Sequence, residues 1–436
     1  MGDLITDASV RRLTPREAWR ALHVLAVVVR HIGPGLVRRR DRNAARLAPR
    51  IKDTVVALGP PFVKLSQVVA SSPGLFPSEI SDALRRLLDD APAEPWPAMQ
   101  AILEDGLGSP IDTHFARVDP VPLAAASIAQ VHAATRLDGR RVVIKLRRTG
   151  IERRFLTDLR LLRVVARLLE RRWKAARVLN PVAIVDDVVL ALRTEIDFRL
   201  EADAMVRFDA NLRRFGSNER IRVPAVHRDL TAAGVLTMDR IDGIKVDDLV
   251  RLELTGFDLT ALLRAGVRAW VEAAAEHGFF HGDVHAGNLM LDGDGRVVFL
   301  DFGIMGELDD ATRAIVRRGV VALLHKREFG EVTDCLVELG AMLGHRVSRD
   351  RVVASIEDLA APLLDMPLSE IDYQEVFVTA VRRAAPHGVQ LPRSLVLLVK
   401  QIIYFERYAK LVAPGYDILA DPTLIDFMVP DAAPSR

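Results

Sequence analysis

The chain has 436 residues, half of them hydrophobic, which is enough for two or three domains or lobes around a sizeable core. Its 60 Lys and Arg against 58 Asp and Glu give a formal net charge of only +2, which excludes the strongly basic balance typical of nucleic-acid-binding proteins. The single cysteine, Cys335, excludes an internal disulfide and a cysteine zinc site, and it suits a reducing cytoplasm.

The N-terminal segment predicts helices over residues 15–58, with a break at Gly33-Pro34-Gly35. Residues 1–52 carry twelve Lys and Arg against four Asp and Glu. This imbalance favours an anionic partner surface such as a membrane face, although an ordinary solvated arginine-rich helix explains it equally well.

The apolar runs of the sequence are too short to cross a bilayer, which takes about 20 apolar residues. Residues 21–29 form such a run, but His23 interrupts it and Arg30 closes it. We therefore expect a cytoplasmic protein, with the inner face of the membrane as its candidate contact surface.

A polar pair precedes the first predicted strands. Lys64 and Gln67 are three residues apart, on one face of a predicted helix, and taken alone they indicate no more than a surface pair. A second helix is predicted at 78–88. A proline-rich connection at 89–97 follows, and a further helix runs to about residue 107.

Residues 128–145 predict a strand, a turn and a second strand that ends in Val-Val-Ile-Lys145. Protein kinases have such a strand, and its Lys holds the α and β phosphates of the nucleotide. Kinases cover these phosphates with a glycine-rich loop. Here the same place is occupied by Ala124, Ala125, Ala126 and Ser127. Backbone amides can still reach phosphates there, although Cβ atoms crowd the approach. The alternatives are a helix start and a surface lysine.

Two helices are predicted next. The first spans 153–177 and is basic and amphipathic. Its apolar stripe, expected to face a core, consists of Phe155, Leu159, Leu162, Val165, Ala166 and Leu169. The second spans 182–201 and ends with Glu195, Asp197 and Glu201. A kinase needs a helix-borne Glu to pair with the strand Lys, so Glu195 and Glu201 are the candidates.

An apolar strand at 235–239 then runs into a polar link. In a kinase this link joins the two lobes and presents backbone groups to adenine, which makes Met238, Asp239 and Ile241 candidate nucleotide-binding residues. After a helix at 258–277, residues 309–412 are almost entirely helical by pattern. Breaks are expected at 340–344, 361–362, 367 and 386–392.

The strongest signal is His281-Gly-Asp283, with Asn288 five residues after the Asp and Asp301-Phe-Gly eighteen after it. Protein kinases place a catalytic Asp, a metal-binding Asn and a second metal-binding Asp in this order. Oxygen ligands are needed to hold Mg²⁺ on the nucleotide phosphates, and a carboxylate is needed to face the acceptor. We expect a hairpin over 289–300 to fix both ends. The alternative, a solvated loop beside a buried strand, would suffice for Asp-Phe-Gly alone.

Taken in order, these motifs resemble the UbiB/AarF (ADCK-type) atypical kinase-like family over about residues 55–310. The resemblance implies an α+β, two-lobed protein-kinase-like fold with a small β-containing N-lobe, a mostly helical C-lobe and an N-terminal helical extension. It also implies a set of site roles. Lys64 would pair with Glu195 and Lys145 with Glu201, Gln67 and Asp197 would belong to the gating motifs, and Asp283, Asn288 and Asp301 would serve ATP and Mg²⁺.

On this pattern residues 1–115 are the extension, 116–241 the N-lobe with a helical insertion, 242–425 the C-lobe and 426–436 a disordered tail. The sequence departs from the family at three positions. Ser66 replaces a glycine, and Val284 and Ala286 replace prolines, so the loop around Asp283 should be less rigid.

The resemblance implies ATP binding and ATPase or small-molecule kinase activity that supports isoprenoid-quinone or lipid metabolism, with a lipid or quinone-precursor client. Two alternatives stay open. One is a small-molecule kinase of the aminoglycoside or choline type, which His281-Gly-Asp283 also fits but which the Lys64-x-x-Gln67 and Glu195-x-Asp197 motifs oppose. The other is an ATP-gated, nonenzymatic binding or scaffold protein.

Overall fold

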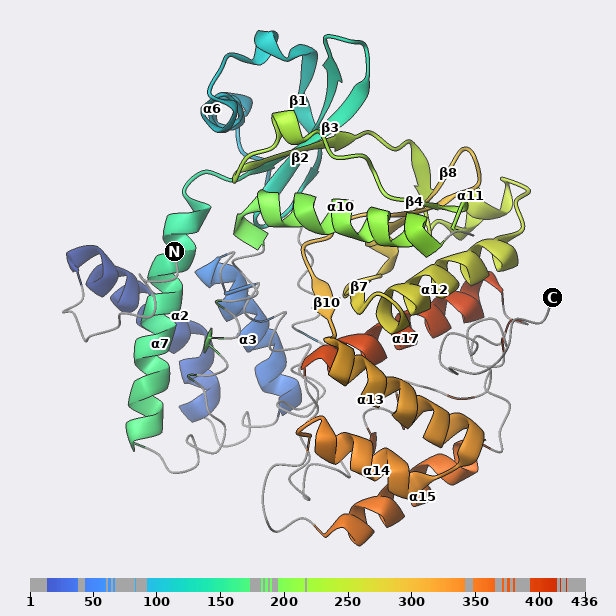
Figure 1. The fold of residues 1–436 in the computed structure, drawn as a ribbon. Helices are drawn as coiled ribbons and strands as arrows, with labels where there is room; N and C mark the ends of the chain where they lie inside the picture. Colours follow the sequence, from blue (N-terminus) through green and yellow to red (C-terminus); the bar gives the residue numbers. More distant parts are fainter. Residues whose placement is uncertain are drawn as a thin grey trace. The chain divides into compact units, whose positions relative to one another are not determined.

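The structure is a computed structural model, and the arrangement of its elements is drawn in Figure 1. It describes residues 14–37, 44–59, 62–63, 66, 83, 92–172, 182, 185–186, 189, 195–215, 218–341, 348–364, 371, 375–376, 379–380, 393–413, 416 and 421. Lys64, Gln67, nearly all of the helix expected at 78–88 and the tail expected at 426–436 lie outside the described residues.

The chain divides into two compact units, and both combine helices with small sheets, as the expected α+β class requires. The first unit consists of Met1–Leu200 and His227–Asp239, and the second of Glu201–Val226 and Arg240–Arg436. The chain therefore passes from one unit to the other inside the segment predicted to link two lobes.

The first unit begins with two packed helices, α2 (Pro15–Val37) and α3 (Ala44–Leu58). Thr14 and Glu17 form a capping box at the start of α2, since each accepts the backbone N–H of the other, at 3.3 and 2.8 Å. The break expected at Gly33-Pro34-Gly35 is wrong, because α2 continues to Val37. A proline inside a helix removes one hydrogen bond but keeps a helical φ, so a helix that packs along a neighbour can pass through it.

An antiparallel sheet of order β1-β2-β3-β5 follows. It contains β1 (Phe115–Ala125), β2 (Ala129–Arg136), β3 (Arg141–Arg147) and β5 (Val235–Asp239). The strand, turn and strand predicted over 128–145 are confirmed as β2 and β3. Strand β1 was not expected, because its two prolines argue against a regular strand. It lies at the sheet edge with an interrupted register, where prolines are tolerated.

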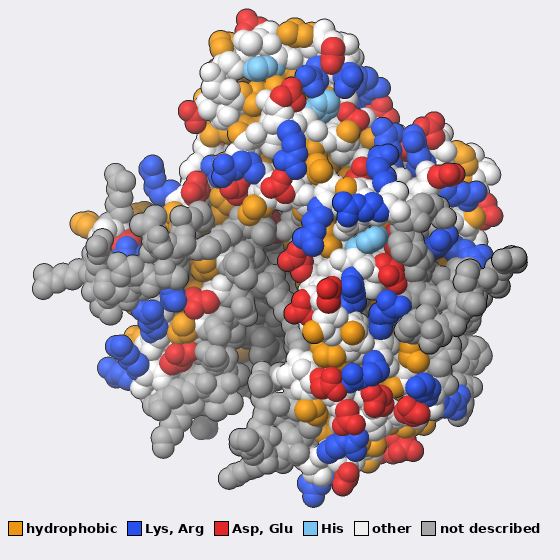
Figure 2. Space-filling view, in the orientation of Figure 1, with side chains coloured by type: hydrophobic (Ala, Val, Ile, Leu, Met, Phe, Trp, Pro, Cys, Tyr) orange, Lys and Arg blue, Asp and Glu red, His pale blue; other side chains and the backbone are white. Residues whose placement is uncertain are grey.

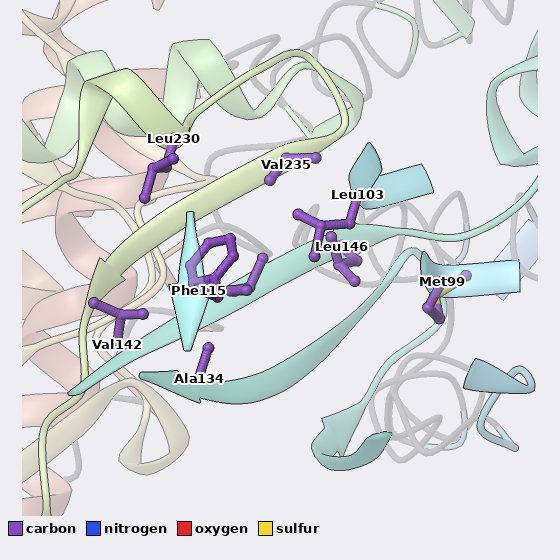
Figure 3. Packing of buried hydrophobic residues seen from close by; sticks show 9 residues of the cluster. Met99, Leu103, Phe115, Ala134, Val142, Leu146, Leu230 and Val235 are labelled. Carbon is purple, nitrogen blue, oxygen red and sulfur yellow. The ribbon is translucent and has the colours of Figure 1, made fainter. Parts of the chain in front are cut away.

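One hydrophobic core cluster of this unit lies between the sheet and α6 (Trp96–Leu107) (Figure 3). Every second side chain of β3 faces it, so Val142, Ile144 and Leu146 are all fully buried. The short turns η2 (Ile111–Thr113) and η3 (Arg228–Leu230) contact β1 and β5, respectively. The predicted helix end near residue 107 is confirmed by the left-handed cap at Gly108.

Helix α7 (Ile151–Arg172) confirms most of the predicted apolar stripe. Phe155, Leu159 and Ala166 are buried, but Val165 is 51% exposed, so its place in the stripe was wrong. The buried positions advance by three and four residues, and Val165, directly before Ala166, lies about 100° around the helix from that line. The side chain of Leu169 is not described.

The single helix expected over 182–201 is also wrong, because the described chain leaves helical structure at Asp197 and α10 (Phe198–Phe215) begins there. The Asp197 carboxylate accepts the backbone N–H of Arg199 at 3.2 Å, a local bond that competes with helix continuation. Glu201 therefore lies in the first turn of α10 rather than at the end of the preceding helix.

The second unit contains two small sheets. One has the order β4-β9-β8-β6 and consists of β4 (Ile221–Arg222), β9 (Val297–Phe299), β8 (Leu289–Asp292) and β6 (Gly243–Lys245). The other pairs β7 (Phe279–His281) with β10 (Met305–Glu307). The predicted hairpin is confirmed as β8 and β9. The Asp292 carboxylate closes its turn by accepting the backbone N–H groups of Asp294 and Arg296 at 3.0 and 2.9 Å.

Besides α10, the second unit contains further helices, and in Figure 1 α12 lies beside α17. The described helical elements are α11 (Leu249–Glu253), α12 (Leu259–Ala275), α13 (Asp310–Val321), η5 (Ala322–Lys326), α14 (Phe329–Glu338), α15 (Arg349–Leu364) and α17 (Arg393–Val412). The break expected at 340–344 is confirmed at its start, where Gly340 has a φ of 71°, and those expected at 367 and 386–392 lie outside the described residues. The break expected at 361–362 is wrong, since α15 runs to Leu364.

Gly306 gives a test of this packing. It pairs with Phe280 across β10 and β7, and a Cβ at residue 306 would overlap the fully buried Phe280 ring. We expect Gly306→Ala to lower the free energy of unfolding by about 1–3 kcal/mol, measured by urea denaturation. Gly293→Ala is the matched control, because its Cβ would meet open space, and it should change stability by less than about 0.5 kcal/mol. Equal stability of the two variants would contradict this packing.

Candidate functional site

The loop after β7 is fixed by His281, which is fully buried. Its Nε2–H donates to the carbonyl of Leu300 at 3.0 Å, and its Nδ1 accepts the backbone N–H of Asp283 at 3.1 Å. Burial lowers the pKa of His281, which keeps the imidazole neutral and suits a ring with one donor and one acceptor. His281 thus connects the Asp283 turn to the residue that precedes Asp301.

Asn288 ends a short 3-10 turn, η4 (Ala286–Asn288), and is buried. Its Nδ2 donates to the carbonyl of Asp283 at 2.9 Å, while its own carbonyl accepts the backbone N–H of Leu300 at 2.9 Å. Because the amide nitrogen is engaged with the backbone, Oδ1 is the atom of Asn288 that suits a hard cation. One hydrogen-bond relay therefore joins Asp283 and Asn288 to Leu300, the residue directly before Asp301.

Asp301 is exposed and has a left-handed backbone, with a φ of 54°. Such a conformation costs a non-glycine residue about 1–2 kcal/mol, and it persists where neighbouring groups hold it. Phe302 provides that hold, since it is buried and its ring lies 5.3 Å from the ring of Phe208 and 5.0 Å from that of His281. Asp301 Oδ1 also accepts the N–H of Gly303 at 3.3 Å.

Asp283 contacts a residue that the sequence did not single out. Lys400 Nζ, from α17, lies 2.8 Å from Asp283 Oδ1, and His285 Nε2 lies 3.6 Å from Oδ2. Burial acts to raise the pKa of Asp283, but the charges of Lys400 and His285 lower it below its ordinary value. The carboxylate is therefore ionised at neutral pH, as a group that orients an acceptor must be.

Two further residues of α17 hold the backbone on both sides of Asp283. Gln401 is fully buried; its Nε2 donates to the carbonyl of Gly282 at 2.7 Å and its Oε1 accepts the N–H of Val284 at 2.8 Å. The Tyr408 hydroxyl donates to the carbonyl of Val284 at 3.1 Å. The available sequence signal was a Lys-Gln pair that directly follows the apolar run 395–399, and it does not reveal a partner 117 residues away.

The predicted phosphate-binding strand is formed, and Lys145 lies in β3 between Val131 of β2 and Leu236 of β5. Its Nζ lies 5.3 Å from the centre of the Phe198 ring, a cation–π contact. Lys145 belongs to the first unit and the buried Glu201 to the second, so their pairing stays a prediction.

The other gating residues are only partly within the described chain. Asp197 binds Arg199, with Oδ2 2.6 Å from Nη2, and this hydrogen bond lowers the pKa of Asp197. Glu195 is half-buried and helical. Because its predicted partner Lys64 lies outside the described residues, as does Gln67, the Lys64–Glu195 pair stays a prediction.

The alanine segment is the turn of the β1–β2 hairpin, so the alternative of a helix start is wrong. Ala124 and Ala125 pair with Val131 and Gln130, as the last residues of β1. The N–H of Ala126 donates to the carbonyl of Ala129 at 2.8 Å, and Ser127 is buried within the turn. Residues 124–127 thus form the turn between β1 and β2, and their role as a phosphate loop that contacts nucleotide stays a prediction.

The predicted adenine-binding segment begins within a strand. Met238 and Asp239 end β5, paired with Val143 and Val142 of β3, and the Asp239 carboxylate lies 3.0 Å from Nε2 of His227. Ile241 follows in the second unit. An adenine contact by this segment stays a prediction.

The acidic array offers few protein ligands to a metal ion. In the part of the chain that the structure describes, no group of three or more His, Cys, Asp or Glu side chains could hold a metal ion. Asn288 and Asp301 supply two oxygen ligands. Mg²⁺ commonly takes one or two protein ligands and completes its shell with water and nucleotide phosphates, so these residues fit a nucleotide-borne Mg²⁺.

Surface charge and helix hydropathy bear on the expected membrane partner. Acidic and basic side chains are interspersed over the described part of the face that Figure 2 shows. None of the helices in the described ranges is long and apolar enough to span a membrane.

Comparisons with known proteins cover both parts of the chain. The family described as ABC1 atypical kinase-like domain matches residues 86–333, and the UbiB helical domain matches residues 356–417. The uncharacterized protein Rv0647c of Mycobacterium tuberculosis is 38% identical over 412 residues, covering 94% of this chain and 84% of that protein. A probable protein kinase UbiB of Xylella fastidiosa is 34% identical over 423 residues, covering 94% and 74%.

A solved structure supports the fold. The complex of Rv3197 with erythromycin, from Mycobacterium tuberculosis, matches with a TM-score of 0.56 and 24% identity, covering 80% of this chain and 91% of that one. Together with the family match, this similarity confirms the expected kinase-like α+β fold.

Proposed function

Since this chain belongs to the ABC1 atypical kinase-like family, we propose that it binds ATP with Mg²⁺ and transfers or hydrolyses the terminal phosphoryl group. Asp283 orients the acceptor hydroxyl or water, and Asn288 and Asp301 hold Mg²⁺. Bound Mg²⁺ neutralises charge on the phosphates. Lys145 binds the α and β phosphates.

The remaining predicted residues complete the proposed site. The backbone of residues 124–127 covers the phosphates, and residues 238–241 contact adenine. Lys64 of the N-terminal extension pairs with Glu195 of the N-lobe to form a gate. These assignments are supported by the order of the motifs and by the strand that carries Lys145.

One observation carries the proposal: the hydrogen-bond relay that joins Asp283, Asn288 and Leu300. The side chain of Asn288 binds the backbone of Asp283, and its backbone binds the residue directly before Asp301. In a simple solvated loop, the residues at the two ends would be expected to be exposed, whereas Asn288 is buried and His281 is fully buried. Phosphoryl transfer needs residues that are held in this way, because its catalysis consists mainly of positioning and electrostatic stabilisation.

We place the protein's client among lipids or isoprenoid-quinone precursors at an anionic membrane surface. The support is the match to the UbiB helical domain and to relatives named UbiB, together with an apolar side of α2. Trp19, Leu22, Leu25 and Val29 follow one side of that helix and are 69, 65, 58 and 59% exposed. An apolar side on a helix within a basic segment is typical of interfacial membrane binding.

The protein is expected to sediment with anionic vesicles and less with neutral ones, and binding should fall as salt screens the charges over about 8 Å or less. Leu22→Glu with Leu25→Glu should weaken binding. Leu137→Glu, on an exposed turn of the same unit, is the matched control and should not. Equal sedimentation with neutral and anionic vesicles would remove the membrane proposal.

The functional classes are separated by phosphate release from ATP and Mg²⁺, with and without anionic vesicles and a phenolic quinone-precursor analogue. An enzyme with a lipid-like client should be stimulated by these additions. ATP binding without release under any condition would instead indicate an ATP-gated binding protein. Phosphorylation of an aminoglycoside or choline would indicate the small-molecule kinase class.

A further inference from the structure

We propose that Lys400 of α17 is a further active-site residue, whose ammonium group contacts the phosphoryl group being transferred, beside Asp283. This inference rests on the proposed function, since it assigns an additional cation to the same reaction. The sequence motifs of the array do not contain Lys400, because it lies 117 residues beyond Asp283 and on a different element.

The ammonium group of Lys400 lies close to where the reacting oxygen would bind. It lies 2.8 Å from Asp283 Oδ1, and the carboxylate must itself lie within hydrogen-bond reach of the attacking oxygen. Two consecutive hydrogen bonds place the ammonium within roughly 6 Å of that oxygen, close enough to meet the phosphoryl group that it attacks. An ammonium has three N–H donors, and the bond to Asp283 uses one of them.

Lys400 and Asp283 are both accessible to a ligand. The side chains of Lys400 and Asp283 are 27 and 20% exposed, so both groups remain open to an incoming ligand. Ion pairs that remain open to solvent contribute only about 0–1 kcal/mol to stability. Tyr404 lies below the ammonium, with its ring centre 5.5 Å from Nζ, and limits its movement on one side.

Helix α17 is fixed against the loop that contains Asp283. Gln401, the next residue, binds the carbonyl of Gly282 and the N–H of Val284, and so holds the backbone on both sides of Asp283. The second of these bonds requires an N–H, which a proline at position 284 would not have. Lys400 is therefore set against Asp283 by a neighbour that cannot shift without breaking two hydrogen bonds.

In the proposed reaction Lys400 acts as a positive charge that stabilises the phosphoryl group, and not as an acid or a base. The acceptor oxygen forms the new bond to the γ phosphorus while the bond from phosphorus to the β–γ bridging oxygen breaks, and ADP leaves with that electron pair. Asp283 takes the acceptor proton. The equatorial oxygens of the phosphoryl group carry the negative charge, and the Lys400 ammonium stabilises it while keeping its own protons.

The test is equilibrium binding of a nonhydrolysable ATP analogue and of ADP, both with Mg²⁺, by the full chain. Lys400→Met should reduce the preference for the ATP analogue over ADP about tenfold, because the lost contact is to the γ phosphate. Lys400→Arg keeps the charge and should retain the preference within about threefold. Lys410→Met removes a lysine of the same helix that pairs with Glu406, and it should leave the preference unchanged.

A double variant separates a direct contact from a positioning role. In an Asp283→Asn background, Lys400→Met should still reduce the preference if Nζ touches the phosphoryl group, and should have no further effect if Lys400 acts only through Asp283. The second result overturns the inference, as does an unchanged preference in the single variant. Wild-type protein that binds neither nucleotide would overturn the proposed function as well, which distinguishes the two failures.

Discussion

Asp301→Asn is expected to abolish Mg²⁺-dependent ATP binding while leaving the fold intact. Asp301 is exposed, and its left-handed turn is held by the buried Phe302, so an isosteric amide should not disturb the packing. The amide keeps an oxygen but loses the negative charge of the carboxylate, which weakens its hold on a hard cation. Loss of an outer-shell partner alone costs a metal site about 10–100-fold, and loss of a direct ligand should cost at least as much.

The measurement is the shift in melting temperature with ATP and Mg²⁺ against the shift with ATP and EDTA. Asp294→Asn is the matched control, because Asp294 lies in the turn of the neighbouring β8–β9 hairpin and its side chain is 72% exposed. The control should keep the full Mg²⁺-dependent shift. A wild-type shift in Asp301→Asn would mean that the metal assignment is wrong.

Asp283→Asn should have the second large effect, a loss of turnover of roughly 10²–10⁴-fold with ATP affinity changed by no more than a few-fold. An amide cannot accept the acceptor proton, but it keeps the shape of the carboxylate beside Lys400. The proposed metal ligands, Asn288 and Asp301, remain. Turnover is measured as phosphate release and affinity by nucleotide titration.

The nucleotide-free melting temperature serves as the control for this variant. Asp283 is engaged with Lys400 and near His285, so some loss of stability is expected. If turnover and ATP binding disappear together in a protein that is still folded, Asp283 is a metal ligand or a structural residue and not the acceptor-orienting group.

The loop and the hairpin that carry the acidic array could be predicted because their parts are close in sequence. Asp283, Asn288 and Asp301 lie within one loop and one hairpin, whose turn residues and apolar strands are local signals. The contribution of α17 could not be predicted in the same way. Lys400 and Gln401 reach the loop only through tertiary packing, and periodicity indicates which residues are buried but not which loop a buried polar group binds.

The wrong predictions of secondary structure also arise from interactions that local sequence patterns do not reveal. Strand β1 was missed because its prolines oppose regular pairing, and only its position at a sheet edge makes them acceptable. The break at Asp197 depends on a side-chain bond to the backbone of Arg199, and helical periodicity continues across it. In α2 the Gly-Pro-Gly sequence indicated a stop, whereas the helix packs along α3 and continues.

The most direct measurement of the central claim is phosphate release from ATP by the full chain as Mg²⁺ is titrated, in parallel with Asp283→Asn. The account predicts release that requires Mg²⁺, saturates with ATP and is absent from the variant, while both proteins bind Mg²⁺ and ATP. Release that is equal in wild type and Asp283→Asn, or that persists in EDTA, would contradict the assignment of this array as a Mg²⁺-dependent phosphoryl-transfer site.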